Sequence, residues 1–224
     1  MGDAAFDEIM PEIVKKTIAN LTYFIVENEK TARRFIKRIC PDKKQSEIVV
    51  YQLNKHQQSA YLQDYIQPLF QGTDVGLLSE AGLPAIADPG GFVVALAHKK
   101  NIPVKPLTGP SSLMLALMSS GLNGQKFSFE GYLPKETSEL KRKIKFLEQL
   151  SAKHHCTKIC IETPYRNQKL LQSFLKYLHP DTLLCIASDL TLPTEFIKTM
   201  PVNKWQKHLP DLHKRPTVFL FQAR

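Results

Sequence analysis

A short apolar run that leads into a loop rich in glycine and proline most constrains how this chain can fold. The run, residues 75–78, has the length and flanks of a strand buried in a parallel sheet rather than of a helix. The loop, residues 79–91, follows directly, and a helical pattern begins at Phe92. Ligands of open α/β sheets bind beyond the carboxyl ends of strands, where glycine and proline allow a rigid backbone to approach closely. The stretch therefore predicts an α/β fold with a binding loop after residue 78.

The same loop has a simpler interpretation, in which it only turns a corner and starts a helix. Asp88 would then be the N-cap and Pro89 the first helical residue. A second loop favours the binding hypothesis, because residues 108–112 (TGPSS) follow an expected strand at residues 101–107 and precede an apolar helix. If the two strands are neighbours, backbone N–H groups and carbonyls from both loops line one cleft.

These loops belong to a set of motifs that occur in one order along the chain. They are residues 78–84 (LSEAGLP), 88–90 (DPG), 106–112 (PLTGPSS), 129–134 (FEGYLP) and 161–166 (IETPYR). Together they resemble the bacterial 16S rRNA ribose 2′-O-methyltransferases, a branch of the tetrapyrrole methylase superfamily, over roughly Gly2 to Phe221. The resemblance implies a class III S-adenosylmethionine methyltransferase fold of two α/β domains, residues 1–109 and 110–224. It implies a mainly parallel sheet in the first domain and a mixed sheet in the second.

The resemblance also implies a cofactor site in a cleft between the domains. In the family, S-adenosylmethionine places its methionine end against the first domain and its adenine end against backbone of the second. The residues that this likeness places near the methionine end are Glu80, Ala81, Gly82, Asp88, Gly109, Ser111 and Ser112. Further candidates are Phe129, Glu130, Leu133 and Pro134, and Ala187 is expected beneath the adenine.

The implied chemistry is in-line attack of a ribose 2′-hydroxyl on the sulfonium methyl, so the protein mainly has to align oxygen and methyl. A base helps, because a sugar hydroxyl is a poor nucleophile until its proton leaves. Glu80, just past the expected strand, is the first candidate base; the equal alternative is a carboxylate that caps backbone N–H groups or neutralises a cation. Arg166 is a candidate phosphate or substrate anchor, with a structural ion pair as its alternative.

The charge balance favours an anionic partner. Thirty Lys plus Arg against twenty-one Asp plus Glu give a formal net charge of +9. A basic helix is expected at residues 30–38, and its cluster of Arg33, Arg34, Lys37 and Arg38 suits RNA phosphates, although a solvated face is an equal alternative. His56 follows another expected strand, at about the place where relatives carry a His-containing polar turn. The resemblance therefore implies that it faces the substrate side of the cleft, with a surface histidine as the commoner alternative. Ribosomal RNA or the small ribosomal subunit is the implied partner, and the family implies a homodimer.

Two other functions stay open from the sequence. A methyltransferase of a small tetrapyrrole would use the same cofactor cleft but would need a broad apolar trough, so RNA binding separates it from the first hypothesis. A catalytically silent RNA-binding or assembly protein would lack cofactor binding. Relatives begin with an extra apolar strand that ends in a Pro-x-Gly turn, whereas this sequence opens at Met1-Gly2-Asp3, where that turn would finish. We expect a truncated start or a protein that has dispensed with part of the site, which puts its activity in question.

The cysteines indicate burial rather than a metal site. Cys40, Cys156, Cys160 and Cys185 lack paired metal-ligand spacing, so we expect no metal, core packing and a reducing cytoplasm. Neither a signal-peptide pattern nor an apolar run of membrane-spanning length is present, so no membrane partner is expected.

Apolar spacing predicts the remaining elements. Helices are expected at residues 3–19, 58–70, 92–97, 113–120, 135–150, 170–178 and near Trp205. Strands are expected at residues 21–26, 48–53, 127–132, 158–161, 183–187, 195–199 and 216–221.

Overall fold

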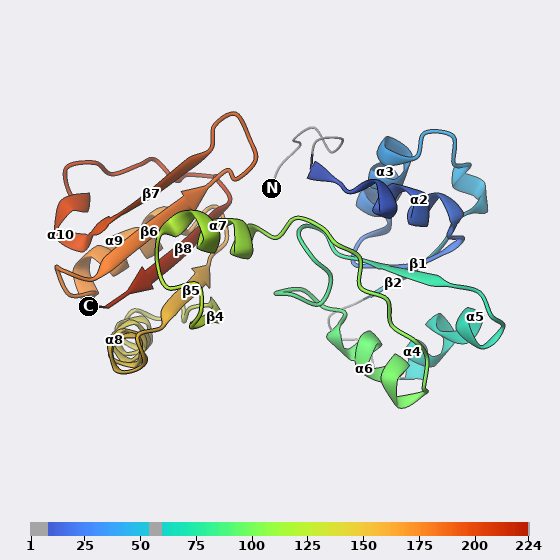
Figure 1. Ribbon diagram of the computed structural model, residues 1–224, viewed down its shortest axis with the longest axis horizontal. Coiled ribbons are helices and arrows are strands. Elements are labelled where there is room, and N and C mark those ends of the chain that lie inside the picture. Colours follow the sequence, from blue (N-terminus) through green and yellow to red (C-terminus); the bar gives the residue numbers. More distant parts are fainter. Residues whose placement is uncertain (1–8, 54–59, 224) are drawn as a thin grey trace. The chain divides into compact units, whose positions relative to one another are not determined.

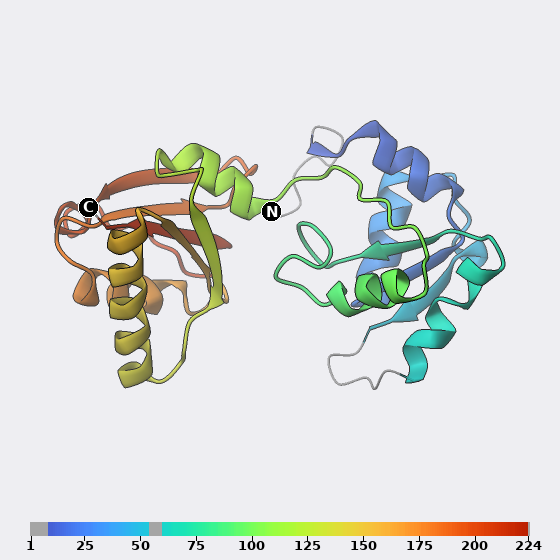
Figure 2. The ribbon, with the colours of Figure 1, turned by 60° about the horizontal axis from the view of Figure 1, so that its bottom comes forward.

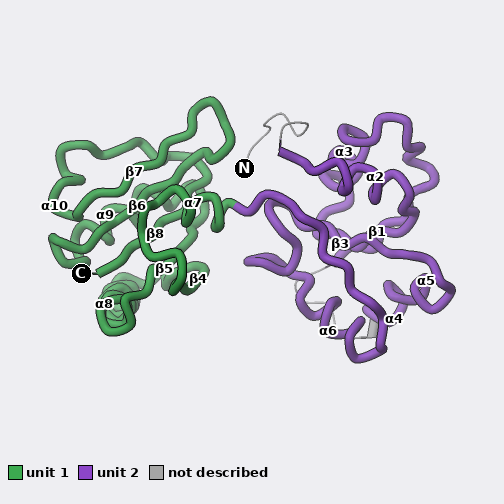
Figure 3. Tube along the Cα trace, in the orientation of Figure 1, with its two compact units in different colours: residues 1–4, 112–224 green, residues 5–111 purple. Residues whose placement is uncertain are grey.

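The computed structural model describes residues 9–53 and 60–223, and the structural statements below refer to these residues (Figure 1). His56 and the beginnings of the helices expected at residues 3–19 and 58–70 lie outside them. The chain divides after Ser111 into two compact units (Figure 3): unit 2 ends at Ser111, and unit 1 takes the residues from Ser112 onward. The two domains expected at residues 1–109 and 110–224 stay a prediction, because compactness alone does not show that each unit is an independent domain.

Unit 2 is built on a parallel three-stranded sheet in the order β2-β1-β3. The central strand β1 (Tyr23–Val26) pairs in parallel with β2 (Val49–Gln52) and with β3 (Val75–Leu78). The strands expected here and the mainly parallel sheet are confirmed. Residues 75–78 are expected from the sequence to be buried, but β3 is only half-buried. The reason is that β3 forms an edge of the sheet.

Helices cover both faces of this sheet, because side chains of β1 point alternately to either side. On one face, α2 (Glu12–Asn20) and α3 (Glu29–Ile39) pack on Phe24 and Val26. On the other face, α4 (Ala60–Tyr65) and α6 (Gly91–Lys99) pack around Ile25. Figures 1 and 2 show the two helix pairs on opposite sides of the strands. The short elements η1 (Gln45–Glu47) and α5 (Gln67–Phe70) complete the unit.

The strand expected at residues 101–107 is not present in the described structure, so that expectation is wrong. After α6 the chain turns at Asn101, whose φ is +57°, and residues 103–110 are irregular and largely exposed. Pro103 and Pro106 explain the difference, because neither has the N–H donor that a strand needs to continue a hydrogen-bond ladder.

Unit 1 contains a mixed five-stranded sheet in the order β4-β5-β8-β6-β7, as expected from the resemblance. The parallel pair is β4 with β5, and the pairs β5–β8, β8–β6 and β6–β7 are antiparallel. The strands are β4 (Phe127–Tyr132), β5 (Thr157–Ile161), β6 (Leu183–Ser188), β7 (Phe196–Pro201) and β8 (Thr217–Gln222).

The two faces of this sheet carry separate cores. Phe219 and Phe221 of β8 pack with α8 (Thr137–His154), α9 (Asn167–Tyr177) and α10 (Val202–Trp205). Val218 and Leu220, which alternate with them, pack with α7 (Ser112–Ser120) on the opposite face. Trp205 is fully buried, and its indole N–H donates to the Leu184 carbonyl at 3.0 Å. Unit 1 therefore buries apolar side chains on both sides of its sheet.

The cysteines are free thiols, and Cys160 and Cys185 are fully buried in these cores. Burial raises the pKa of the Cys185 thiol to about 11, so core packing is confirmed as its role. Within residues 9–53 and 60–223, no group of three or more His, Cys, Asp and Glu side chains is arranged to hold a metal ion. None of the described helices is both long enough and apolar enough to span a membrane.

Candidate functional site

The carboxyl ends of β1 and β3 bring two acidic residues together in unit 2. Glu27 directly follows β1, and Glu80 lies just beyond β3. Because neighbouring parallel strands run in the same direction, they end at the same edge of the sheet. The Glu80 backbone N–H donates to Glu27 Oε1 at 3.1 Å, so the Glu27 carboxylate fixes the start of the loop at residues 79–91.

The Glu80 side chain is oriented by Thr31, in the first turn of α3. Thr31 Oγ1 lies 2.5 Å from Glu80 Oε1 and donates its proton to that oxygen. Thr31 is itself placed by the helix cap, since its backbone N–H donates to Asn28 Oδ1 at 3.2 Å. The Asn28 carbonyl, 3.1 Å away, is the other acceptor within reach of the Thr31 hydroxyl. A capped helix thus holds one oxygen of an exposed carboxylate and leaves the other available.

The alternative role of Glu80 finds no support in the part of the chain that the structure describes. There, no backbone N–H donates to its carboxylate and no cation lies within ion-pair distance of it. Its function as a base stays a prediction, but its position at the carboxyl edge of a parallel sheet is the position expected for a residue that meets a ligand.

The loop at residues 79–91 adopts a backbone conformation unusual for its sequence. Ala85 and Ala87 have φ of +65° and +67°, a region that residues with a Cβ seldom adopt. Gly90 has φ +132° and is the N-cap of α6, with no side-chain cap, so the interpretation of Asp88 as N-cap is wrong. A Cβ at Gly90 would lie 3.1 Å from Leu77 Cδ2, a tight contact, and its positive φ favours glycine there.

The two loops singled out from the sequence approach each other within unit 2, although the second does not follow a strand. A Cβ added at Gly109 would lie 3.1 Å from Leu83 Cδ2, which is closer than an ordinary contact. Gly109 therefore permits this approach. By contrast, a Cβ at Gly82 would meet nothing within 4 Å, so the backbone there faces open space.

The expected site residues fall in both units. Of those expected around the cofactor, unit 2 holds Glu80, Ala81, Gly82, Asp88, Gly109 and Ser111, and unit 1 holds Ser112, Phe129, Glu130, Leu133, Pro134 and Ala187. Arg166, the expected substrate anchor, also lies in unit 1. Ala81 and Gly82 are exposed, whereas Ser111 is nearly buried. The cleft that would unite the two sets stays a prediction.

Glu130 takes part in a local ionic network of unit 1. Its carboxylate accepts the Ser128 hydroxyl at 2.8 Å and lies 3.4 Å from Lys143 Nζ and 3.6 Å from Lys158 Nζ. Burial opposes ionisation, but the hydrogen bond and the two ammonium groups outweigh it and hold the pKa of Glu130 below its ordinary value. The network gives Glu130 a structural role whether or not it also meets a cofactor.

Other expected cofactor residues of unit 1 differ in exposure. Phe129 is partly exposed beside Ile159 of β5, and Pro134 is half-buried. Leu133 is part of the core under α8 and α9, and Ala187 is fully buried against α7. Neither of these two side chains presents a surface, so a ligand there would meet backbone, as the resemblance implies for the adenine.

Arg166 pairs with a buried carboxylate. Its Nη2 lies 3.1 Å from Glu162 Oε2, and only 2% of the Glu162 side chain is exposed. The structural ion pair, which the sequence left open, is therefore present. Because about a third of the Arg166 side chain, 30%, stays exposed, a role in substrate binding stays a prediction.

Arg33, one of the four basic residues expected to meet RNA phosphates, is engaged within unit 2, so its role toward RNA stays a prediction. Its Nε pairs with Glu29 at 2.8 Å, and its terminal nitrogens donate to the Gln45 and Ile48 carbonyls at 2.8 and 3.1 Å. The guanidinium thereby ties α3 to the turn before β2. The other three members of the cluster, Arg34, Lys37 and Arg38, are exposed on α3.

Sequence reasoning missed several residues at these sites. Thr31 and Glu27 contact Glu80, and the only local signal for them was their place at the end of β1 and the start of α3. In unit 1, His213 and Lys214 lie against the ring of Tyr165, at 6.3 Å between ring centroids and 6.0 Å from Nζ to centroid. No local pattern linked these residues, because they come from separate loops.

Comparison with known proteins places the fold and the motifs in one family. The family model described as Tetrapyrrole (Corrin/Porphyrin) Methylases matches residues 10–205. The "Ribosomal RNA small subunit methyltransferase I" of Vibrio cholerae is 35% identical over 152 residues, which are 68% of this chain and 51% of that protein. The protein of the same name from Escherichia coli O157:H7 is 27% identical over 78% of this chain and 60% of its own length. The chain thus spans about half to three fifths of these relatives.

Solved structures share the fold at low sequence identity. The methyltransferase CobJ superposes with a TM-score of 0.62 at 13% identity, over 97% of this chain and 89% of CobJ. The cobalt precorrin-4 methyltransferase CbiF gives a TM-score of 0.60, also at 13% identity, over 96% and 89%. At this identity the likeness concerns the fold alone.

Proposed function

The chain belongs to the tetrapyrrole (corrin/porphyrin) methylase family, and from this we propose that it is an S-adenosylmethionine-dependent methyltransferase that modifies a ribose 2′-hydroxyl of ribosomal RNA. The observation that carries the proposal is its similarity to relatives named for methylation of small-subunit ribosomal RNA. The net charge of +9 supports a polyanionic substrate.

The described residues of unit 2 fit the methionine end of this cofactor. Around Gly82 the backbone is exposed, has φ +77° and faces open space, so N–H and carbonyl groups are accessible to an amino-acid moiety. Glu27, whose carboxylate accepts the Glu80 backbone N–H, supplies negative charge for its ammonium group. The residues that would hold the cofactor near its methionine end are Ala81, Gly82, Asp88, Gly109, Ser111 and Ser112. Toward the adenine end they would be Phe129, Glu130, Leu133, Pro134 and Ala187. When bound, the cofactor supplies an electrophilic methyl group on a sulfonium sulfur.

The chain itself supplies proton transfer and orientation. Glu80 Oε2, the oxygen that Thr31 leaves available, would accept the proton of the ribose 2′-hydroxyl. Thr31 and Glu27 hold the side chain and backbone of Glu80 in place, which reduces the reorganisation needed for that transfer. A positioned general base typically contributes about 10²- to 10⁴-fold in rate.

Glu80→Gln tests this proposal. We expect the wild-type chain to bind S-adenosylmethionine in isothermal titration and to transfer a labelled methyl group to small ribosomal subunits. The variant should keep the dissociation constant within a few fold and lose about 10²- to 10⁴-fold in transfer rate. Glu47→Gln, an exposed glutamate of the same unit, serves as the control and should change neither quantity.

Three negative results would each reject a different part of the proposed function. If the chain binds no S-adenosylmethionine but binds RNA, it is a silent RNA-binding protein rather than an enzyme. If it binds the cofactor and Glu80→Gln transfers methyl groups at the wild-type rate, Glu80 is not the base. Transfer to a tetrapyrrole but not to RNA would refute the substrate assignment.

The homodimer and the cytoplasmic location implied by the resemblance are part of the proposal. Sedimentation velocity of the purified chain would report the mass of a dimer if the chain is a homodimer. A monomer at all concentrations would refute the homodimer.

A further inference from the structure

Tyr165 is a large aromatic side chain that unit 1 leaves exposed on a loop. It follows β5, between Pro164 and Arg166, and 72% of its surface is accessible. No other large apolar side chain is exposed on this loop, residues 162–166, or on the loop before β8, residues 211–216. A single exposed ring, rather than a broad apolar patch, suits recognition of one planar group better than docking of a protein surface.

Two residues of the loop before β8, residues 211–216 and called the second loop below, lie against this ring. Lys214 Nζ lies over the ring, 6.0 Å from its centroid, within cation–π range. The His213 imidazole approaches at 6.3 Å between centroids and at 76° to the ring plane, an edge-on geometry. The aromatic surface is therefore combined with a positive charge. Within the described part of the chain, no carboxylate lies within ion-pair distance of Lys214.

The second loop is held in place on both sides of Lys214. The Lys214 N–H donates to the Pro164 carbonyl at 3.2 Å, which joins the two loops directly. Leu212 is fully buried, and its N–H donates to Gln168 Oε1 at 3.0 Å. Arg215 pairs with Asp189, a mostly buried carboxylate, at 2.7 Å. Because these contacts order the loops in advance, a ligand would not have to fix them on binding.

The charges around the ring are of both signs. Arg166 is adjacent but neutralises Glu162, and Arg215 neutralises Asp189. Asp211 is the exposed acidic neighbour, and its Oδ1 accepts the backbone N–H of His213 at 2.9 Å. Lys214 is thus the cation on these loops that has no described carboxylate partner and can meet a phosphate.

We propose that Tyr165 and Lys214 form a stacking site for one unpaired RNA base, with Tyr165 covering the base and Lys214 meeting a neighbouring phosphate. Sequence-specific RNA recognition relies on such aromatic stacking of unpaired bases. The assignment of RNA rests on the proposed function, whereas the ring, its cation and their rigid support come from unit 1 itself.

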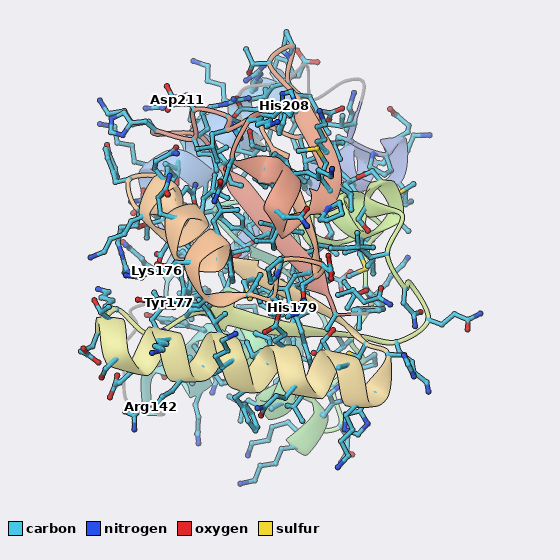
Figure 4. All side chains as sticks on the ribbon, turned by 90° about the vertical axis from the view of Figure 1, so that its left-hand side faces the viewer. Arg142, Lys176, Tyr177, His179, His208 and Asp211 are labelled. Carbon is cyan, nitrogen blue, oxygen red and sulfur yellow. The ribbon has the colours of Figure 1, made fainter. Side chains whose placement is uncertain are left out.

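Unit 1 offers matched controls for both side chains. Phe146 of α8 is also exposed, at 52%, with Lys143 Nζ 5.9 Å from its centroid. Lys176 of α9 lies over Tyr177 at 5.6 Å. Figure 4 places Lys176 and Tyr177 at the end of α9, well apart from Asp211 on the second loop, and Arg142 on the outer side of α8. Phe146→Ala therefore removes an exposed aromatic ring, and Lys176→Ala removes a lysine that lies over a ring, at positions away from Tyr165 and Lys214.

The test is binding of the purified chain to a single-stranded RNA oligomer that contains one 2-aminopurine, whose fluorescence is quenched by stacking. Tyr165→Ala should weaken binding about 10- to 100-fold and abolish protein-dependent quenching, whereas Tyr165→Phe should stay within about threefold of wild type. Lys214→Ala should weaken binding and reduce the slope of log affinity against log salt by about 0.7. Phe146→Ala and Lys176→Ala should bind as wild type, and melting temperatures confirm that all variants are folded.

Three results would overturn the stacking site. Wild-type affinity of Tyr165→Ala would reject it while leaving RNA as the substrate. Loss of binding in Tyr165→Phe equal to that in Tyr165→Ala would assign the effect to the hydroxyl and not to stacking. A chain that binds S-adenosylmethionine but no RNA would reject the site and leave methyl transfer to another substrate, so the two proposals fail separately.

Discussion

The orientation of Glu80 depends on one hydroxyl proton from another segment of the chain. Thr31→Val keeps the shape of the side chain but removes the donor that lies 2.5 Å from Glu80 Oε1. If Glu80 is the base, we expect kcat for methyl transfer to fall about 10- to 100-fold with KM nearly unchanged, because a hydrogen bond to a charged group contributes about 1.5–3 kcal/mol. Thr31→Ser restores the hydroxyl and should recover most of the rate. Equal rates for the valine and serine variants would contradict the positioning role.

Glu130 should make the stability of unit 1 depend on pH. Because its pKa is lower in the folded chain, its contribution is complete above the unfolded pKa of about 4.3 and is lost as the pH falls through the folded pKa. Glu130→Gln leaves Lys158, of which 7% is exposed, without its carboxylate, so we expect a loss of about 2 kcal/mol in the free energy of unfolding at pH 7.

Urea unfolding of Glu130→Gln at two pH values checks this expectation. The difference from wild type should shrink as the pH falls below the unfolded pKa, because the carboxyl of Glu130 then takes up a proton in the unfolded chain before it does so in the folded chain. Glu139→Gln, at an exposed position of α8, should show no such convergence. A constant difference at both pH values would show that Glu130 acts through packing and not through its charge.

At the level of elements, β3 packs closely on β1 because it contains Gly76. A Cβ there would lie 2.9 Å from Leu21 Cδ1 and 3.0 Å from Phe24 Cδ1, and Phe24 is fully buried and unable to move freely. We therefore expect Gly76→Ala to destabilise the chain by about 1–3 kcal/mol in urea unfolding. Gly124→Ala is the control, since a Cβ at Gly124 meets nothing within 4 Å. Equal stability of the two variants would show that the sheet adjusts without cost.

The elements that could be predicted best are those whose own sequence decides them. The strand expected at residues 127–132 has those bounds in the structure, and the helix expected at residues 135–150 is α8, extended to His154. The strand expected at residues 101–107 is absent from the described structure. Its apolar residues suit a strand, but its two prolines limit the hydrogen bonds that pairing needs. Whether such a segment joins a sheet depends on a partner strand, which local composition does not specify.

At the level of the whole molecule, unit 1 has a core on each face of its own sheet. We therefore expect residues 112–224, expressed alone, to fold and to unfold cooperatively, as circular dichroism and dispersed amide signals in NMR would show. Residues 1–111 should be less stable alone, because their sheet has three strands and a half-buried edge. An unfolded fragment 112–224 would contradict the assignment of an autonomous domain.

The sequence by itself determined the family, the order of most helices and strands, and the loops that contain Glu80, Gly82 and Gly109. These follow from local apolar periodicity and from motifs of neighbouring residues, which a chain carries without being folded. Only the tertiary structure decided that Thr31 orients Glu80, that Arg33 is used inside unit 2, and that Lys214 lies over Tyr165. Each of these contacts joins residues far apart in the chain. They depend on strand order and side-chain direction, which arise when the sheets assemble and leave no local pattern in the sequence.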